Sequence, residues 1–131
     1  MRFDRVIVVD WSGRAARSPV RESRDAISIG LCEPGRETQT YCRSRAEAEA
    51  VLAARLAEGG RQLVGFDFPM GYPAGLARRL TGSDNARSLH GWLADRITDA
   101  PDNANNRFDV AEAINVQLGG PGPFWGCPKA K

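Results

Sequence analysis

Two aspartates follow apolar runs, and their chemical type and placement suit the binding of a metal ion. Asp10 comes directly after Val6–Val9, and Asp67 closes the later run Leu63–Phe66. The first run consists of β-branched residues, which is typical of a strand buried on both faces. A carboxylate at the end of such a strand is costly to desolvate unless it binds a cation or reaches water. Each aspartate is therefore either a site residue or an ordinary strand end.

Parallel pairing of the two runs would bring these carboxylates together. Neighbouring strands lie about 4.8 Å apart, so side chains at matching depth can share an ion. Two close carboxylates repel each other unless a cation or a proton lies between them. Magnesium prefers carboxylate oxygens and retained waters, and a pair of such ions can activate water and stabilise the leaving oxygen in phosphodiester cleavage. The pattern predicts a Mg²⁺ or Mn²⁺ site at Asp10 and Asp67.

Three strand signals occupy the first third of the chain. The first covers about 3–10, and the second, 26–32, alternates apolar and polar residues. A Pro34-Gly35 turn signal leads to a third run, 38–42, which is the most polar and suits an edge strand. These signals predict an antiparallel meander.

A helix and a fourth strand complete the expected core. Ser44 and Glu47 fit a capping box, strong helix formers follow, and Gly59-Gly60 ends the helix. Its apolar stripe consists of Ala48, Val51, Leu52 and Leu56. Such a helix can return the chain so that 62–67 lies parallel to the first strand. We therefore expect an α/β core over 3–67.

The remainder of the chain is predicted to be a helical segment, 73–118, followed by a tail. Helices are expected from Pro73 to Leu80, from Ala86 to Ile97 with Ser83 or Asp84 as the cap, and from Asn106 to Leu118. The last is expected to carry one apolar face of Phe108, Ala111, Ile114 and Leu118. The tail, 119–131, is rich in glycine and proline, which excludes regular structure. We treat 1–131 as one domain, with the Phe124-Trp125 pair of the tail as a candidate oligomerisation surface.

The segments Val6–Gly13 (VIVVDWSG) and Val64–Pro73 (VGFDFPMGYP) resemble an uncharacterised bacterial family of predicted ribonuclease H-like nucleases. The resemblance covers about 3–75. It implies a ribonuclease H-like mixed sheet, in which three antiparallel strands and a helix precede a fourth strand parallel to the first. It also implies nuclease activity, with Asp10 and Asp67 as metal ligands and catalytic residues.

The family pattern expects a further acidic residue after a fifth strand, and no convincing fifth strand occurs before residue 131. The chain is then a fragment, or its catalytic set is incomplete. Asp109, with Glu112 at i+3 on the same expected helix, is the candidate third carboxylate, although a solvated helix face explains both residues more simply. Glu47 is better explained by capping.

Substrate binding is assigned to the polar connection that follows Asp10. Ser12, Arg14 and Arg17 are the candidates, because arginine suits phosphate geometry. Acidic neighbours dilute this charge, and no aromatic stacking platform interleaves with the arginines. The Ser12-Gly13 turn also resembles the first phosphate loop of actin- and sugar-kinase-like ATPases, which need a second domain. A catalytically silent binding or scaffold module is the remaining alternative.

Composition narrows the class of protein. A net charge of +2 over 131 residues does not imply a strongly basic surface, and 42% hydrophobic residues argue against disorder. Three cysteines and one histidine make a structural zinc site improbable. With neither a signal peptide nor an apolar run of membrane-spanning length, we expect a cytoplasmic protein with no membrane partner. Nucleic acid is a partner that the family resemblance allows, and the sequence leaves RNA, DNA and other phosphoesters open as substrates.

Overall fold

The computed structural model describes residues 2–69, 71–120, 122 and 124. Contacts divide the chain into two compact units. The first comprises 1–69 together with the short segment 100–104, and the second comprises 70–99 and 105–131. The boundary falls between the expected core, 3–67, and the expected helical segment, 73–118. Both units lie within the span predicted above as one domain.

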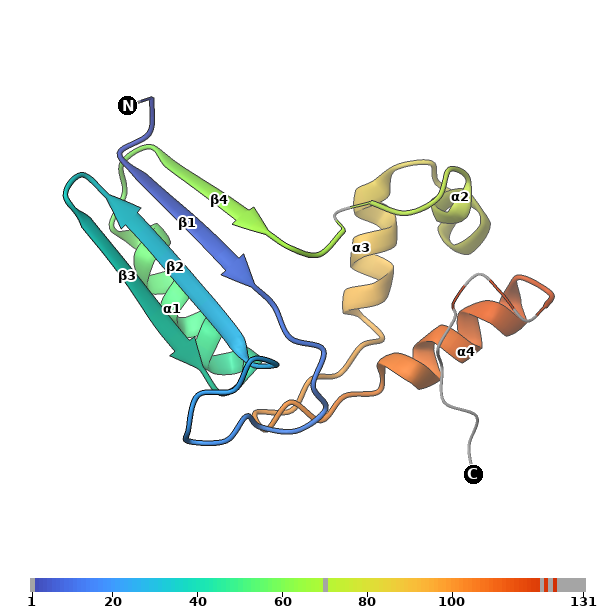
Figure 1. Cartoon of the computed structure of the whole chain (residues 1–131). Helices are drawn as coiled ribbons and strands as arrows, with labels where there is room; N and C mark the ends of the chain where they lie inside the picture. The colour runs from blue at the N-terminus through green and yellow to red at the C-terminus, as the bar shows by residue number, and fades with distance from the viewer. Residues whose placement is uncertain (1, 70, 121, 123, 125–131) are drawn as a thin grey trace. The chain divides into compact units, whose positions relative to one another are not determined.

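The first unit is an α/β structure built on a four-stranded mixed sheet (Figure 1). Its elements are β1 (Arg5–Asp10), β2 (Ile27–Glu33), β3 (Arg36–Cys42), α1 (Arg45–Ala57) and β4 (Gln62–Phe66). The strand order is β3-β2-β1-β4, in which β1 and β3 run antiparallel to β2, and β4 runs parallel to β1. This arrangement confirms the predicted meander, helix and parallel fourth strand.

The β2–β3 hairpin shows why the meander could be predicted. Glu33 pairs with Arg36, so Pro34 and Gly35 alone form the turn. Gly35 adopts φ of 74°, a left-handed conformation that glycine tolerates because it has no Cβ. The turn chemistry thus sets the register of the two strands.

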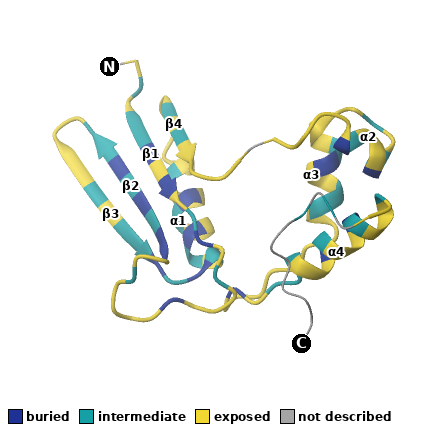
Figure 2. Ribbon diagram, turned by 45° about the vertical axis from the view of Figure 1, so that its right-hand side comes forward, coloured by how far each residue is buried: buried dark blue, intermediate teal, exposed yellow. Residues whose placement is uncertain are grey.

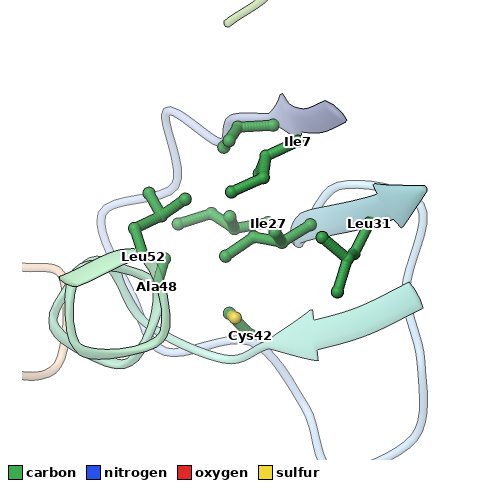
Figure 3. Close-up of a cluster of buried hydrophobic side chains, with 8 residues drawn as sticks. Ile7, Ile27, Leu31, Cys42, Ala48 and Leu52 are labelled. Carbon is green, nitrogen blue, oxygen red and sulfur yellow. The ribbon is translucent and has the colours of Figure 1, made fainter. Parts of the chain in front are cut away.

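One face of the sheet packs against α1 and forms the core of this unit (Figure 3). Its buried side chains are Ile7, Val9, Ile27, Ile29, Leu31, Cys42, Ala48 and Leu52. The prediction that β1 is buried on both faces is wrong, because Val8, on the opposite face, is 58% exposed. Figure 2 shows buried and exposed stretches within β1. Within the described part of the chain, α1 covers one side only. Leu56, expected in the helix stripe, is also exposed.

The start of α1 confirms Ser44 as its N-cap. The Ser44 Oγ accepts a hydrogen bond from the Glu47 N–H at 3.2 Å. The Glu47 carboxylate reaches back one residue further than in a standard capping box, and its Oε2 accepts from the Arg43 N–H at 2.7 Å. The two bonds therefore link the first turn of α1 to the residues before it, one through the Ser44 side chain and one through the Glu47 side chain.

The described part of the second unit contains three short helices, α2 (Leu76–Thr81), α3 (Ala86–Ala94) and α4 (Arg107–Gln117). Their buried side chains form a separate core of Leu76, Leu80, Leu89, Val110 and Ile114. None of the described helices is long and apolar enough to cross a membrane.

Three details of the helical segment differ from expectation. Pro73 does not open α2, which begins at Leu76 after Gly75 in a left-handed conformation. The cap of α3 is Asn85, whose side chain accepts from the Arg87 N–H, and neither Ser83 nor Asp84. Phe108 is 38% exposed, because the buried stripe of α4 starts two residues later, at Val110, and continues at Ile114.

The tail prediction lies largely outside the described residues, which exclude Pro121, Pro123 and 125–131. Phe124 is described and packs against the core of the second unit. Its backbone forms two hydrogen bonds of 3.1 Å with the side-chain amide of Asn115. Oligomerisation through the tail therefore stays a prediction.

Candidate metal centre

The carboxyl ends of β1 and β4 bring Asp10 and Asp67 together. The two strands pair in parallel from Arg5 with Gln62 through Val9 with Phe66. The Asp67 N–H then donates to the Val9 carbonyl at 3.3 Å, which continues the ladder by one residue. Asp10 and Asp67 are the next residues along each chain and thus lie opposite each other.

One oxygen of Asp67 has a defined partner. Its Oδ1 accepts a hydrogen bond from the Trp11 N–H at 3.0 Å, which holds the carboxylate beside the end of β1. Among the described residues, nothing donates to the other Asp67 oxygen or to the Asp10 carboxylate. Both aspartates are exposed. A cation can reach these oxygens without displacing an existing ion pair.

The donor set fits a hard divalent ion that keeps much of its hydration. Residues 2–69, 71–120, 122 and 124 contain no group of three or more His, Cys, Asp or Glu side chains able to hold a metal. Two carboxylates with waters in the remaining positions is a usual arrangement for Mg²⁺. Asp109 belongs to α4 of the second unit, so the first unit holds the pair without it.

The residues assigned to substrate binding already have partners within the first unit. Ser12 is buried, and its hydroxyl donates to the Asp25 carbonyl and accepts from the Arg14 N–H. The Arg14 guanidinium lies 3.8 Å from the Asp25 carboxylate. These contacts give Ser12 a role in shaping the loop, and they leave its hydroxyl little capacity to cradle phosphate, as the ATPase alternative would require.

Arg17 pairs with Glu47 at the start of α1. The hydrogen bond from the Arg43 N–H is the main cause that lowers the pKa of Glu47, and Arg17 lowers it further. Glu47 is thus occupied by helix capping and by this ion pair. The sequence interpretation of Glu47 as a capping residue agrees with its contacts.

The open face of the sheet adds residues that sequence patterns did not single out. Asp10 lines two adjoining hollows, and Ser28 and Gln39 border both of them. Glu22 and Arg24 border the second hollow, and both side chains are exposed. Ser28 lies opposite Asp10 in the β1–β2 register. Alternation in β2 could have indicated that Ser28 lies on the polar face, but not that it pairs with Asp10. The loop residues carry no comparable signal, because loop conformation has no period.

Arg45 and Asn103 hold the loop that follows Asp10. The Arg45 guanidinium donates to the Arg14 carbonyl at 2.9 Å and to the Ser12 carbonyl at 3.4 Å. Asn103 is buried; its Oδ1 accepts from the Arg45 N–H at 2.8 Å, and its Nδ2 donates to the Ala16 carbonyl at 3.3 Å. The path of the loop is therefore set largely by bonds to backbone carbonyls.

The arrangement can hold a divalent cation at an exposed sheet edge beside a polar hollow that contains one free arginine side chain, Arg24, among the described residues. Such a site can bind a phosphate ester through the ion and orient a water. Comparison of the chain with family models, with curated proteins and with solved structures gave no match. The ribonuclease H-like relationship therefore stays a prediction from the sequence.

Proposed function

We propose that the first unit binds Mg²⁺ or Mn²⁺ through Asp10 and Asp67 and hydrolyses phosphodiester bonds of nucleic acid. One observation carries the proposal: β1 and β4 pair in parallel and in register, and each is followed or closed by an aspartate at the shared edge. The sheet order β3-β2-β1-β4, with a helix between β3 and β4, supports the ribonuclease H-like type.

The residues of the chain divide the work as follows. Asp10 and Asp67 hold the ion, and the Trp11 N–H keeps one oxygen of Asp67 turned toward the end of β1. Arg24, exposed at the rim of the hollow, offers a positive charge to a substrate phosphate. The bound ion supplies charge stabilisation at the phosphoryl oxygen and a lowered pKa for a water. Ser12, Arg14 and Arg17 shape the loop.

The direct test is cleavage of labelled RNA and DNA oligonucleotides by the full chain in Mg²⁺ or Mn²⁺. We expect Asp10→Asn and Asp67→Asn each to abolish cleavage, because an amide is a poor ligand for these ions. Asp4→Asn is the matched control. Asp4 directly precedes the first residue of β1, far from the metal pair along the strand, and it forms an ion pair with Arg61. Cleavage that survives both site substitutions contradicts the proposal.

Among the described residues, no third His, Cys, Asp or Glu side chain joins Asp10 and Asp67 in a metal-binding group, and this favours a second candidate: a metal-binding module that lacks hydrolytic activity. This candidate predicts a melting temperature that rises with Mn²⁺ and loses that rise in Asp67→Asn, with no cleavage of any oligonucleotide. The same set of variants therefore separates the two candidates.

A further inference from the structure

We propose that the first of the two hollows on the open face of the sheet binds the nucleoside next to the metal-bound phosphate, so that the site recognises a single nucleoside and not only a phosphate backbone. The inference rests on the proposed function, because it names the substrate class of that site. The hollow has a volume of about 550 Å³, within the range of small-molecule sites. Its lining includes Val8, Asp10, Ser28, Gly30, Glu37 and Gln39.

The strand register places this hollow on the same face of the sheet as the Asp10 carboxylate. Val8 and Asp10 alternate with buried residues of β1, so both point away from α1. Gly30 pairs with Val8, and Ser28 pairs with Asp10. The floor at Gly30 is therefore two residues along β2 from the partner of Asp10, which is about 7 Å at the rise of an antiparallel strand. The sugar of a nucleotide can span such a separation between its phosphate and its base.

The floor of the hollow is flat because Gly30 has no side chain. A Cβ at this position would meet the Val8 carbonyl oxygen at 3.8 Å, which is ordinary contact, so packing does not require a glycine there. Gly30 is not among the glycines with positive φ, and its pairing with both neighbouring strands continues without a bulge. A glycine inside a strand weakens it and often marks the close approach of a ligand to the backbone. Ligand approach is the explanation that fits Gly30.

The charges around the first hollow favour an uncharged group over a second phosphate. The carboxylates that line it belong to Asp10 and Glu37, and carboxylates repel a further anion. Arg24 borders the second hollow instead. The first hollow therefore suits the neutral part of a nucleotide, whereas the second suits its phosphates.

Gln39 and Ser28 supply hydrogen-bonding groups to the hollow. The Gln39 Nε2 donates to the Ser28 Oγ at 2.7 Å, which fixes the side-chain amide. This bond uses one of the two Nε2 hydrogens, so the amide can still offer one donor and its Oε1 acceptor to a ligand. A donor and an acceptor side by side match the edge of a nucleobase. A flat floor, a polar edge and a neighbouring phosphate site together fit a nucleoside phosphate.

The test compares adenosine 5′-monophosphate with inorganic phosphate, which lacks the nucleoside. The full chain is titrated with each ligand in Mg²⁺ by calorimetry. Contacts with the nucleoside should make the nucleotide bind about tenfold more tightly than phosphate. Gly30→Val fills the hollow with a side chain that strands favour. It is expected to remove this advantage, with phosphate affinity unchanged.

Gly65→Val is the matched control. Gly65 pairs with Val8 on the side away from Gly30, borders neither hollow, and has nothing within 4 Å of an added Cβ. We expect it to change neither affinity. Equal affinities of the parent chain for nucleotide and phosphate overturn the nucleoside site. An equal loss of both affinities in Gly30→Val, or the same loss in Gly65→Val, also overturns it.

A second measurement needs no substitution. Cys32 borders the first hollow, whereas Cys42 lies in the core under α1. Alkylation of each cysteine can be followed by mass spectrometry of its peptide. Adenosine 5′-monophosphate in Mg²⁺ is expected to slow alkylation of Cys32 several-fold, and inorganic phosphate is expected to leave it unchanged. A Cys32 rate that does not respond to saturating nucleotide overturns the proposal.

The two proposals fail separately. A preference for the nucleotide that Gly30→Val removes, in a chain that cleaves no oligonucleotide, leaves the nucleoside site standing and removes the hydrolase. Cleavage of oligonucleotides with the same KM in the parent and in Gly30→Val leaves the hydrolase standing and removes the nucleoside site.

Discussion

At the scale of single residues, Asp67 has two separable tasks. One oxygen accepts from the Trp11 N–H, and the carboxylate charge is available to a cation. Asp67→Asn keeps an acceptor for Trp11, whereas Asp67→Ala removes acceptor and charge together. We expect Asn to leave the free energy of unfolding within about 0.5 kcal/mol of the parent and Ala to lower it by about 1 kcal/mol. Both should lose the rise in melting temperature with Mn²⁺.

Urea unfolding with and without Mn²⁺ measures both effects. Asp4→Asn, at the other end of β1, should keep the Mn²⁺ response. If Asn and Ala destabilise the apo protein equally, the Trp11 hydrogen bond contributes nothing. If Asn retains the Mn²⁺ response, the charge of Asp67 is not a ligand.

At the scale of elements, the start of α1 predicts a specific acid sensitivity. The Arg43 N–H and then Arg17 lower the pKa of Glu47 in the folded protein. A carboxyl with a lowered folded pKa stabilises the fold at pH above its unfolded pKa, and this stability is lost as the pH falls through the folded pKa. Glu47→Gln should therefore be less stable than the parent at neutral pH, with the difference shrinking in acid. Unfolding in urea at neutral and acid pH tests this sign, and a constant difference contradicts it.

Ser44→Ala is the companion change at the same helix end. It removes the Oγ acceptor of the Glu47 N–H and should cost about 1 kcal/mol. Because a hydroxyl does not titrate in this range, its cost should be the same at both pH values. This pH-independent variant separates the loss of the cap from the loss of the charge.

The loop at Asn103 is a second element whose geometry depends on one side chain. Asn103 is the one described non-glycine residue with positive φ, 78°, and it is buried with hydrogen bonds to Arg45 and Ala16. Asn103→Gly retains a residue that tolerates this conformation, while Asn103→Ala adds about 1 kcal/mol of backbone strain. Both lose bonds worth about 1 to 3 kcal/mol. Ala should therefore destabilise more than Gly.

Hydrogen exchange gives a local measurement of the same loop. The Ser18 N–H donates to the Arg43 carbonyl, which Asn103 also contacts. We expect its exchange to accelerate in both Asn103 variants. Asn85→Gly, which removes an exposed cap in the second unit, is the matched control and should leave Ser18 protected. Equal stability of the Gly and Ala variants would show that backbone conformation at 103 is not strained.

At the scale of the whole molecule, local patterns predicted the sheet but not what surrounds it. Alternation in β2 and the Pro34-Gly35 turn act within a few residues, so the β2–β3 hairpin followed from them. The exposed face of β1 could not be foreseen, because a run of β-branched residues does not reveal which elements cover it. That Asp10 and Asp67 are neighbours could be predicted, because two parallel strands that each end in an aspartate bring these residues to the same end of the sheet. The partner of Ser12 could not be predicted, since the Asp25 carbonyl is backbone and leaves no trace in residue type.

The rate at which the buried thiol of Cys42 is labelled reports the stability of the first unit, and therefore also the stabilisation of that unit by a bound metal ion. Cys42 lies in the core under α1, and burial raises the pKa of its thiol, so labelling requires the unit to open. A cation that binds only the folded unit stabilises it by about 2.7 kcal/mol at a hundred times its Kd, which slows labelling about 100-fold.

In a chain with Cys32→Ser and Cys127→Ser, we expect Mn²⁺ to slow the reaction of Cys42 with a thiol reagent. Asp10→Asn should abolish the slowing, because the site then lacks one of its two carboxylates, whereas Asp4→Asn should preserve it. Equal slowing in the Asp10 variant would assign the bound ion to another part of the molecule.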